Sequence, residues 1–287
     1  MTCAEWLRKY TSVFQKAYID EAADEVMLLL CHALRLNKAE VLARPERALT
    51  SSELTLLEGM VERRLQREPA AYITGEKEFY GLDFFVDHRV LIPRPETETL
   101  VEAAIDFHRS WALRNHRRML AADIGTGCGA IAIALAVNIQ EAQLYAVDIS
   151  PVALEVAAIN IHRHGFEERI IPVHGNLLEQ IKQKMDLIVA NLPYISRGDL
   201  PCLQPEIHLH EPPVALDGGE KGTDIIQALL EQAPDRLAAG GALVLEMGEG
   251  QEQRLMPVVK RSLPGADITL VKDLAGINRC MKVILPC

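Results

Sequence analysis

The pattern of apolar and polar residues changes near residue 70. Before this point, apolar residues recur at helical spacing, as at Ala22, Val26 and Leu29, and the stretch 50–53, Thr-Ser-Ser-Glu, offers N-cap candidates for a further helix. The pattern predicts a small helical bundle over residues 1–73. Such a bundle serves either the stability of the chain or the docking of a macromolecular substrate.

Two short β-prone runs follow the bundle, over 76–80 and 82–86, and Gly81 separates them. A glycine between two such runs favours a hairpin. We expect residues 74–94 to form a β-hairpin linker between two domains, with Pro95 in the first turn of the next helix.

From about residue 118 onward, apolar runs of strand length alternate with helical stretches. This alternation predicts an α/β domain over 95–287 with a parallel, doubly wound sheet. The last two runs are joined only by 272–279, which is too short for a helical crossover, so they should be antiparallel neighbours. A seven-stranded Rossmann-like sheet with this ending is typical of class I S-adenosylmethionine-dependent methyltransferases and not of nicotinamide dehydrogenases. The expected strands are 119–124, 144–147, 170–173, 187–190, 242–246, 268–271 and 281–285.

Composition and charge narrow the class of protein. The 287 residues carry a formal net charge of -10, which disfavours general binding to nucleic acid because phosphate contacts need clustered Lys and Arg. No apolar run approaches the ~20 residues that span a bilayer, and no signal peptide is visible. The six cysteines show no paired spacing, so we expect reduced thiols, a cytoplasmic location and no zinc site.

A glycine-rich turn follows the first strand of the predicted sheet. Residues 123–129 read Asp-Ile-Gly-Thr-Gly-Cys-Gly and open a helix, so the backbone can approach a ligand closely. The G-x-G-x-G spacing differs from the G-x-G-x-x-G of dinucleotide sites. Asp148 ends the next strand, where a carboxylate can accept hydrogen bonds from ribose hydroxyls. The two features together favour S-adenosylmethionine, with a nicotinamide cofactor as the alternative.

The stretch most informative about chemistry is the tetrad 191–194, Asn-Leu-Pro-Tyr, which ends a buried strand. Pro193 stops the strand, so Asn191 lies at its carboxyl end, where open α/β sheets bind ligands. An amide or exocyclic amino nitrogen is a poor nucleophile because its lone pair is delocalised. The Asn191 side-chain oxygen and the Leu192 carbonyl can orient its N–H groups and stabilise the developing positive charge. Tyr194 can pack against the flat group, and no metal is required.

With these motifs, the chain resembles the release-factor glutamine methyltransferases from about Glu68 to the C-terminus. The most specific match is the proline-rich stretch 91–98, Leu-Ile-Pro-Arg-Pro-Glu-Thr-Glu, and the glycine turn and the tetrad match as well. The resemblance implies transfer of a methyl group from S-adenosylmethionine to the side-chain nitrogen (N5) of a glutamine. That glutamine would be the one in the Gly-Gly-Gln motif of class 1 peptide-chain release factors. Further matching stretches are 68–75, 78–81, 211–222 and 273–276.

The resemblance also implies a set of site residues. Two positions depart from the family pattern: Leu192 replaces a proline, which makes the turn less rigid, and Asn176 stands where Asp is usual. Cys128 stands where a small residue is typical and would be mildly oxidisable if exposed. The implied cofactor residues are Asp123, Gly125, Thr126, Gly127, Cys128, Gly129, Asp148, Ile149, Asn176, Leu177 and Asn191, and the implied catalytic and substrate-binding residues are Asn191, Leu192, Pro193 and Tyr194.

Apart from the resemblance, Arg94 and Glu96 are candidates for contacts with the substrate backbone or the cofactor carboxylate. The alternative is a purely structural role at the start of the helix. The loop 195–219 is expected to form a lid or a wall around the glutamine.

Three other functions stay open. A related tetrad would grip a flipped base in an adenine-N6 DNA methyltransferase, although the acidic balance of this chain argues against that substrate. A ribosomal-protein glutamine methyltransferase would share both fold and tetrad. A non-catalytic S-adenosylmethionine-binding protein is the third alternative, and Leu192 is the only residue that raises it.

Overall fold

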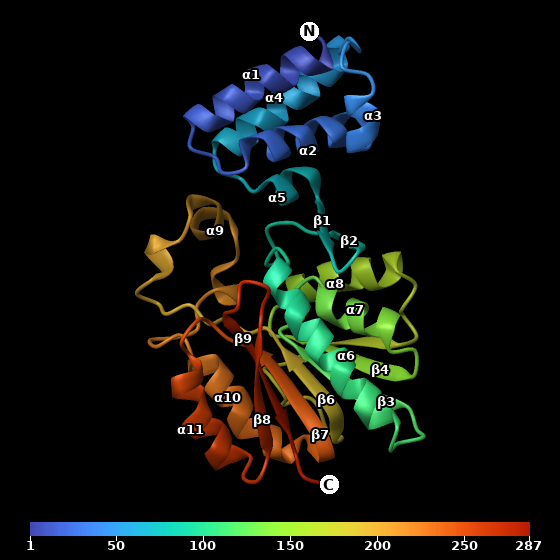
Figure 1. The fold of residues 1–287 in the computed structure, drawn as a ribbon, viewed down its shortest axis with the longest axis vertical. Coiled ribbons are helices and arrows are strands. Elements are labelled where there is room, and N and C mark those ends of the chain that lie inside the picture. The colour runs from blue at the N-terminus through green and yellow to red at the C-terminus, as the bar shows by residue number, and fades with distance from the viewer. The chain divides into compact units, whose positions relative to one another are not determined.

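The computed structural model describes all residues, 1–287, and the chain forms two compact units (Figure 1). Unit 1 contains Met1–Glu76 together with the distant segment Gln204–His210. Unit 2 contains Lys77–Leu203 and Glu211–Cys287. The proposed functional division at 1–73, 74–94 and 95–287 stays a prediction. The structure adds that residues 204–210 belong with the helices of unit 1.

Unit 1 is a helical bundle, as predicted. The helices that begin at Cys3 and Ser51 each start with a capping box. Thr2 and Thr50 accept from a backbone N–H, and the glutamate three residues on accepts from the N–H of the threonine. Of the N-cap candidates in 50–53, Thr50 is the residue that caps the helix. The core is built on large apolar side chains that include Trp6 and Phe14. The helices are α1 (Cys3–Lys16), α2 (Ala22–Leu34), α3 (Lys38–Leu42), α4 (Ser51–Leu65), α5 (Ala70–Thr74) and α9 (Pro205–His210).

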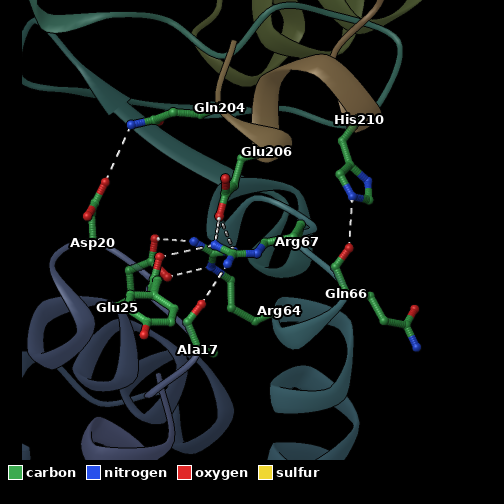
Figure 2. A network of polar contacts seen from close by, with 10 residues as sticks. Ala17, Asp20, Glu25, Arg64, Gln66, Arg67, Gln204, Glu206 and His210 are labelled. Atoms are coloured by element: carbon green, nitrogen blue, oxygen red, sulfur yellow. Dashed lines mark hydrogen bonds and ion pairs between the residues drawn. The ribbon is translucent and has the colours of Figure 1, made fainter. Parts of the chain in front are cut away.

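A network of charged groups attaches α9 to the rest of unit 1 (Figure 2). The side chain of Arg64 is 3% exposed, and its guanidinium donates to Glu25 Oε2 at 2.5 Å and to Glu206 Oε1 at 2.9 Å. Arg67 donates to Glu206 Oε1 at 3.1 Å and to the Ala17 carbonyl at 2.6 Å. A buried arginine needs such partners because an unpaired charge is costly in a low-dielectric environment. The network therefore fixes α9 by its only carboxylate.

We predict that Arg64→Met destabilises unit 1 by about 3 kcal/mol, because it leaves the partly buried carboxylate of Glu25 without its cation and leaves Glu206 with Arg67 alone. Urea unfolding in a Trp111→Phe background measures this, since Trp6 then remains as the single tryptophan reporter and lies in unit 1. Lys38→Met is the matched control. It breaks an ion pair with Asp24 whose side chains are 62% and 73% exposed, so the loss should stay below about 0.5 kcal/mol. Equal losses in the two variants would contradict a special role for Arg64.

Unit 2 is built on a seven-stranded sheet in the order β5-β4-β3-β6-β7-β9-β8. Strands β3 to β7 pair in parallel, whereas β9 is antiparallel to both β7 and β8. The predicted strands and the antiparallel ending are thus confirmed. The strands are β3 (Met119–Ile124), β4 (Ala142–Asp148), β5 (Ile170–His174), β6 (Met185–Ala190), β7 (Leu237–Glu246), β8 (Asp267–Lys272) and β9 (Asn278–Ile284).

Helices cover both faces of this sheet (Figure 1). Ile188 and Ala190 pack on one face with residues of α10 and α11, and the intervening Leu187 and Val189 are equally buried on the other. Burial on both faces explains why β6 is a continuous apolar run and does not alternate. The helices are α6 (Glu98–Ala112), α7 (Ala130–Asn138) and α8 (Pro151–Arg163) on one face, with α10 (Asp224–Gln232) and α11 (Glu252–Ser262) on the other.

The predicted hairpin is formed by β1 (Glu76–Phe79) and β2 (Leu82–Phe85). Its two turn residues, Tyr80 and Gly81, have φ of 53° and 73°. Positive φ at both turn positions matches the twist of two-residue hairpins and favours glycine at the second position. No helix in the structure is both long and apolar enough to cross a membrane.

Candidate functional site

The strand order of the sheet reverses between β3 and β6, and this switch point places the glycine turn beside the tetrad. Ile124 is in register with Ala190, so Gly125 and Asn191 leave the sheet side by side. A cavity of about 450 Å³ lies at this edge, within unit 2. Open α/β sheets bind ligands at such a crevice.

Most of the predicted site residues line this cavity. The exceptions are the interior positions of the glycine turn, the last residue of the tetrad and the two candidates from the proline-rich stretch. The predicted residues that line the cavity are Gly125, Gly127, Asp148, Ile149, Asn176, Leu177, Asn191, Leu192 and Pro193; those that do not are Asp123, Thr126, Cys128, Gly129, Tyr194, Arg94 and Glu96.

The glycine turn has the backbone conformation that only glycine adopts without strain. Gly125, Gly127 and Gly129 have φ of 77°, 55° and 85°. A Cβ on Gly125 would lie 3.0 Å from Leu192 Cδ2, so the absence of a side chain at this position makes room for the Leu192 side chain. The turn therefore keeps its backbone open to the cavity and packs directly on the tetrad.

Behind the turn, Asp123 acts as its internal support. Its Oδ2 accepts from the Thr126 hydroxyl at 2.7 Å and from the Ala132 amide at 3.2 Å. Burial raises the pKa of Asp123 to about 7. Cys128 is also buried, and burial raises its pKa to about 12, so the thiol has neither the exposure nor the thiolate character for ready oxidation.

Asp148 ends β4 and connects the turn to the start of α8. Its Oδ2 accepts from the Gly127 amide at 2.9 Å, and its Oδ1 accepts from the Ser150 amide at 2.8 Å. Burial raises the pKa of Asp148. Each carboxylate oxygen has a second lone pair, so the group can still accept from hydroxyls in the cavity.

The wall beyond Asp148 contains a strained residue. Leu177 has φ of 53°, a conformation that is costly for a residue with a branched side chain. The next amide, of Leu178, donates to Gln232 Oε1 at 2.8 Å, which holds this turn in place. Asn176 lines the cavity beside Leu177, with its Nδ2 donating to Glu179 Oε1 at 3.0 Å.

The first two residues of the tetrad present unpartnered acceptors. Asn191 Nδ2 donates to the Thr97 hydroxyl at 3.0 Å, which leaves Oδ1 without a partner in a residue that lines the cavity. The Leu192 carbonyl likewise accepts no hydrogen bond, and its side chain is buried against the glycine turn. Two free acceptors next to one another can hold the two N–H groups of an amide or amino nitrogen.

Tyr194 is held behind the tetrad and does not line the cavity. Its hydroxyl donates to Glu246 Oε1 at 3.3 Å, and its carbonyl accepts from Gln251 Nε2 at 2.8 Å. Burial raises the pKa of Tyr194 to about 12. A Cβ on Gly222 would lie 2.4 Å from the Tyr194 carbonyl oxygen, so the returning loop packs tightly on this residue. The expectation that Tyr194 packs on the substrate stays a prediction.

Arg94 positions the loop that follows the tetrad. Its Nη2 donates to Glu211 Oε1 at 2.5 Å, and the Glu211 side chain is 1% exposed. Burial raises the pKa of Glu211, and Arg94 opposes that rise. Glu211 leads directly into the part of the loop that lines the cavity, whereas Glu96 is exposed. The loop residues in the cavity wall are Arg197, Pro212, Pro213, Val214, Ala215 and Asp217.

Three residues with supporting contacts were not singled out from the sequence: Thr97, Glu246 and Gln251. Thr97 lies inside the proline-rich stretch, but its pairing with Asn191 joins positions that are far apart in the chain. Glu246 offered a signal, since it is a charged residue that ends an apolar strand next to β6, as Asn191 does. Gln251 offered none, because a glutamine in a turn is usually solvated.

The sheet order and the cavity at its switch point define a class I methyltransferase. Residues 5–75 match the family described as PrmC N-terminal domain, and residues 111–201 match the methyltransferase small domain. The release factor glutamine methyltransferase of Bradyrhizobium diazoefficiens is 38% identical, over 96% of this chain and 92% of the relative. That of Geobacter sulfurreducens is 38% identical, over 96% and 93%. This chain belongs to the release factor glutamine methyltransferase family.

A solved structure agrees in fold. The 16S rRNA N2 G1207 methyltransferase of T. thermophilus, in complex with AdoMet and guanosine, matches with a TM-score of 0.51 and 16% identity. The match covers 73% of this chain and 49% of that chain. At this identity the likeness concerns the fold alone.

We predict that Glu246→Gln flattens the pH dependence of stability. The folded-state pKa of Glu246 is about 7, against 4.5 without burial, so the folded protein binds this proton more tightly than the unfolded chain. The stability from this group is therefore present below pH 4.5 and is lost as pH rises to 7, by up to about 3 kcal/mol. Urea unfolding at pH 5 to 8 should show a smaller decline in the variant.

Asp123 titrates in the same window but is present in both proteins, so the difference between their curves isolates Glu246. Glu231→Gln is the control, because the Glu231 side chain is 66% exposed and this substitution should leave the curve parallel to that of the wild type. Parallel curves for Glu246→Gln as well would show that the carboxyl does not titrate with a raised pKa.

Proposed function

We propose that this protein transfers a methyl group from S-adenosylmethionine to the side-chain nitrogen (N5) of the glutamine in the Gly-Gly-Gln motif of class 1 peptide-chain release factors. The observation that carries the proposal is the pair of unpartnered acceptors, Asn191 Oδ1 and the Leu192 carbonyl, beside the cavity. The similarity to release factor glutamine methyltransferases supports the choice of substrate.

The cavity fits the proposed cofactor in size and chemistry. Its volume of about 450 Å³ is within the usual range for small-molecule sites. Gly125 and Gly127 leave room for a ligand against the backbone, Asp148 offers acceptors for ribose hydroxyls, and Asn176 and Leu177 would flank the adenine. Ile149, 54% exposed beside Asp148, provides an apolar surface for a flat ring. When bound, S-adenosylmethionine supplies an electrophilic methyl group on its sulfonium sulfur.

The residues of the tetrad would act on the glutamine nitrogen. Asn191 Oδ1 and the Leu192 carbonyl would each accept one of its N–H groups, which directs the nitrogen lone pair toward the methyl group. As the carbon–nitrogen bond forms, positive charge develops on the nitrogen, and the same two oxygens stabilise it. Leu192 contributes through its backbone, so the replacement of proline at this position preserves the acceptor.

The unit 1 helices and the loop 195–219 would serve recognition of the release factor. The net charge of -10 supports a protein and not a nucleic acid as substrate. The proposed site of action is the cytoplasm, where translation termination takes place. Arg94 and Glu211 would hold the loop wall against which the glutamine enters.

Mass spectrometry of a purified class 1 release factor, incubated with this protein and S-adenosylmethionine, tests the proposal. We expect a gain of one methyl group on the glutamine of the Gly-Gly-Gln motif, and none on a release factor in which that glutamine is alanine. Cofactor binding without methyl gain would overturn the assignment of substrate and favour another protein glutamine.

Asn191→Ala should lower kcat by about 100-fold or more, the scale for loss of one transition-state acceptor. Its affinity for S-adenosylmethionine should change little, because the glycine turn and Asp148 are intact. Steady-state methyl transfer and calorimetry measure the two quantities. Turnover equal to that of the wild type would remove Asn191 from the chemistry.

Asp148→Ala should instead weaken the binding of S-adenosylmethionine and leave kcat nearly unchanged. We expect the affinity for S-adenosylmethionine to fall about 10- to 100-fold, since a charged hydrogen bond to the ribose contributes roughly 1.5–3 kcal/mol. At saturating cofactor, kcat should remain close to that of the wild type. Unaltered affinity in calorimetry would exclude Asp148 from the cofactor site.

A further inference from the structure

Glu246 is a buried carboxyl that the reaction does not require directly. It ends β7, and because Leu245 is in register with Ala190, Glu246 lies level with Asn191 on the neighbouring strand. It is 1% exposed and does not line the cavity. Tyr194 donates to its Oε1 at 3.3 Å. Burying a carboxyl is costly, so its position behind the tetrad suggests a specific task.

Thr97 stands between Glu246 and Asn191. Its hydroxyl oxygen accepts from Asn191 Nδ2 at 3.0 Å. Glu246 Oε2 is buried and accepts no hydrogen bond in the structure. The Thr97 hydroxyl lowers the pKa of the Glu246 carboxyl, as a nearby donor does, and is therefore the donor available to this unpartnered oxygen.

The number of protons in this chain of contacts determines which way Asn191 faces. An ionised carboxylate can only accept, so the single hydroxyl proton of Thr97 is directed to Glu246. Thr97 can then only accept from Asn191, which requires Nδ2 on the Thr97 side and Oδ1 on the cavity side. We propose that Thr97 and Glu246 are positioning residues that fix the Asn191 amide with its oxygen toward the substrate nitrogen.

The inverted amide would be unproductive. With Nδ2 toward the cavity, Asn191 would present N–H donors to a substrate nitrogen that itself carries N–H groups. The two orientations of an asparagine amide have nearly the same shape, so packing alone does not choose between them. The hydrogen-bonding polarity of Thr97 and Glu246 does choose between the two orientations. The inference rests on the proposed function only for its effect on turnover.

Several groups face Glu246 and influence its charge. Burial has the largest effect and raises the pKa of Glu246. The side chains of Thr97, Arg279 and Tyr194 lower this pKa and Glu96 raises it, so that the pKa is about 7. The buried thiol of Cys280 also faces it. A protonated Glu246 could donate to Thr97, and the Thr97 proton could then turn to Asn191 Oδ1. The fraction of correctly oriented Asn191 should therefore fall as pH decreases through 7.

Methyl transfer to a release factor tests the inference through three variants. Thr97→Val keeps the shape but removes the hydroxyl, and should lower kcat roughly 10- to 100-fold with little change in KM. Thr97→Ser keeps the hydroxyl and should restore kcat to within about threefold of the wild type. Glu246→Gln, whose amide both donates and accepts at every pH, should lower kcat and abolish the decline of kcat below pH 7.

Thr223→Val is the matched control. Thr223 is fully buried and its hydroxyl accepts from the side-chain amide of Gln227 at 2.8 Å, yet it does not line the cavity. The Thr223→Val variant should lose stability as Thr97→Val does, but its kcat should equal that of the wild type. Wild-type kcat in Thr97→Val, a rise in KM alone, or no rescue by Thr97→Ser would overturn the inference. A decline of kcat near pH 7 that persists in Glu246→Gln would exclude Glu246.

Nuclear magnetic resonance tests the hydrogen bond from Asn191 Nδ2 to Thr97 without turnover. In protein labelled with ¹⁵N on asparagine alone, the Asn191 side-chain amide, assigned by its loss in Asn191→Ala, should exchange slowly with water. Thr97→Val should accelerate that exchange at least about 10-fold, while Thr223→Val should not. Absence of methyl transfer by the wild type would overturn the proposed function, whereas unchanged Asn191 exchange in Thr97→Val would overturn this inference independently.

Discussion

The parallel pairing of β3 with β6 is the constraint on which the site depends. These strands are distant in the chain, and their register brings Gly125 to Asn191 at one edge of the sheet. The contact is tight enough that a Cβ on Gly125 would meet Leu192. A change of one residue in this register would turn every side chain of β6 to the opposite face and separate the cavity from the tetrad. The geometry of the candidate site is thus a consequence of strand pairing in the core.

Around that pairing, the protein buries several charged or polar groups, and each has a structural reason. Asp123 supports the glycine turn, Glu211 accepts from Arg94, and Asn160 bridges the Phe85 backbone and the Cys128 carbonyl. Burial of such groups costs free energy unless they are paired. Only one arrangement of the loops that they join forms all of these pairs, so that arrangement is favoured. The result is a cavity whose walls are held by specific contacts as well as by apolar packing.

Much of the fold and of the candidate site was predictable from the sequence, because the sequence patterns that indicate them are local. The strands of unit 2 are continuous apolar runs, the Gly125 turn follows one of them, and Asn191 follows another. The residues that support the site were harder to predict. Thr97 and Glu246 act through contacts between segments distant in sequence, and Gln251 matters because the loop at Gly222 returns beside it. Hydrophobic periodicity carries no information about such pairings.

The segment Gln204–His210 has a consequence for how this protein can vary in evolution. The chain passes between its two units three times, after Glu76, after Leu203 and after His210, so the helical unit is not a separable N-terminal block. A recombination that exchanged residues 1–76 for those of another gene would separate Arg64 from Glu206, and the new helices would have to supply an equivalent cation. The two units are therefore expected to be inherited together, with Arg64 and Glu206 changing only as a pair.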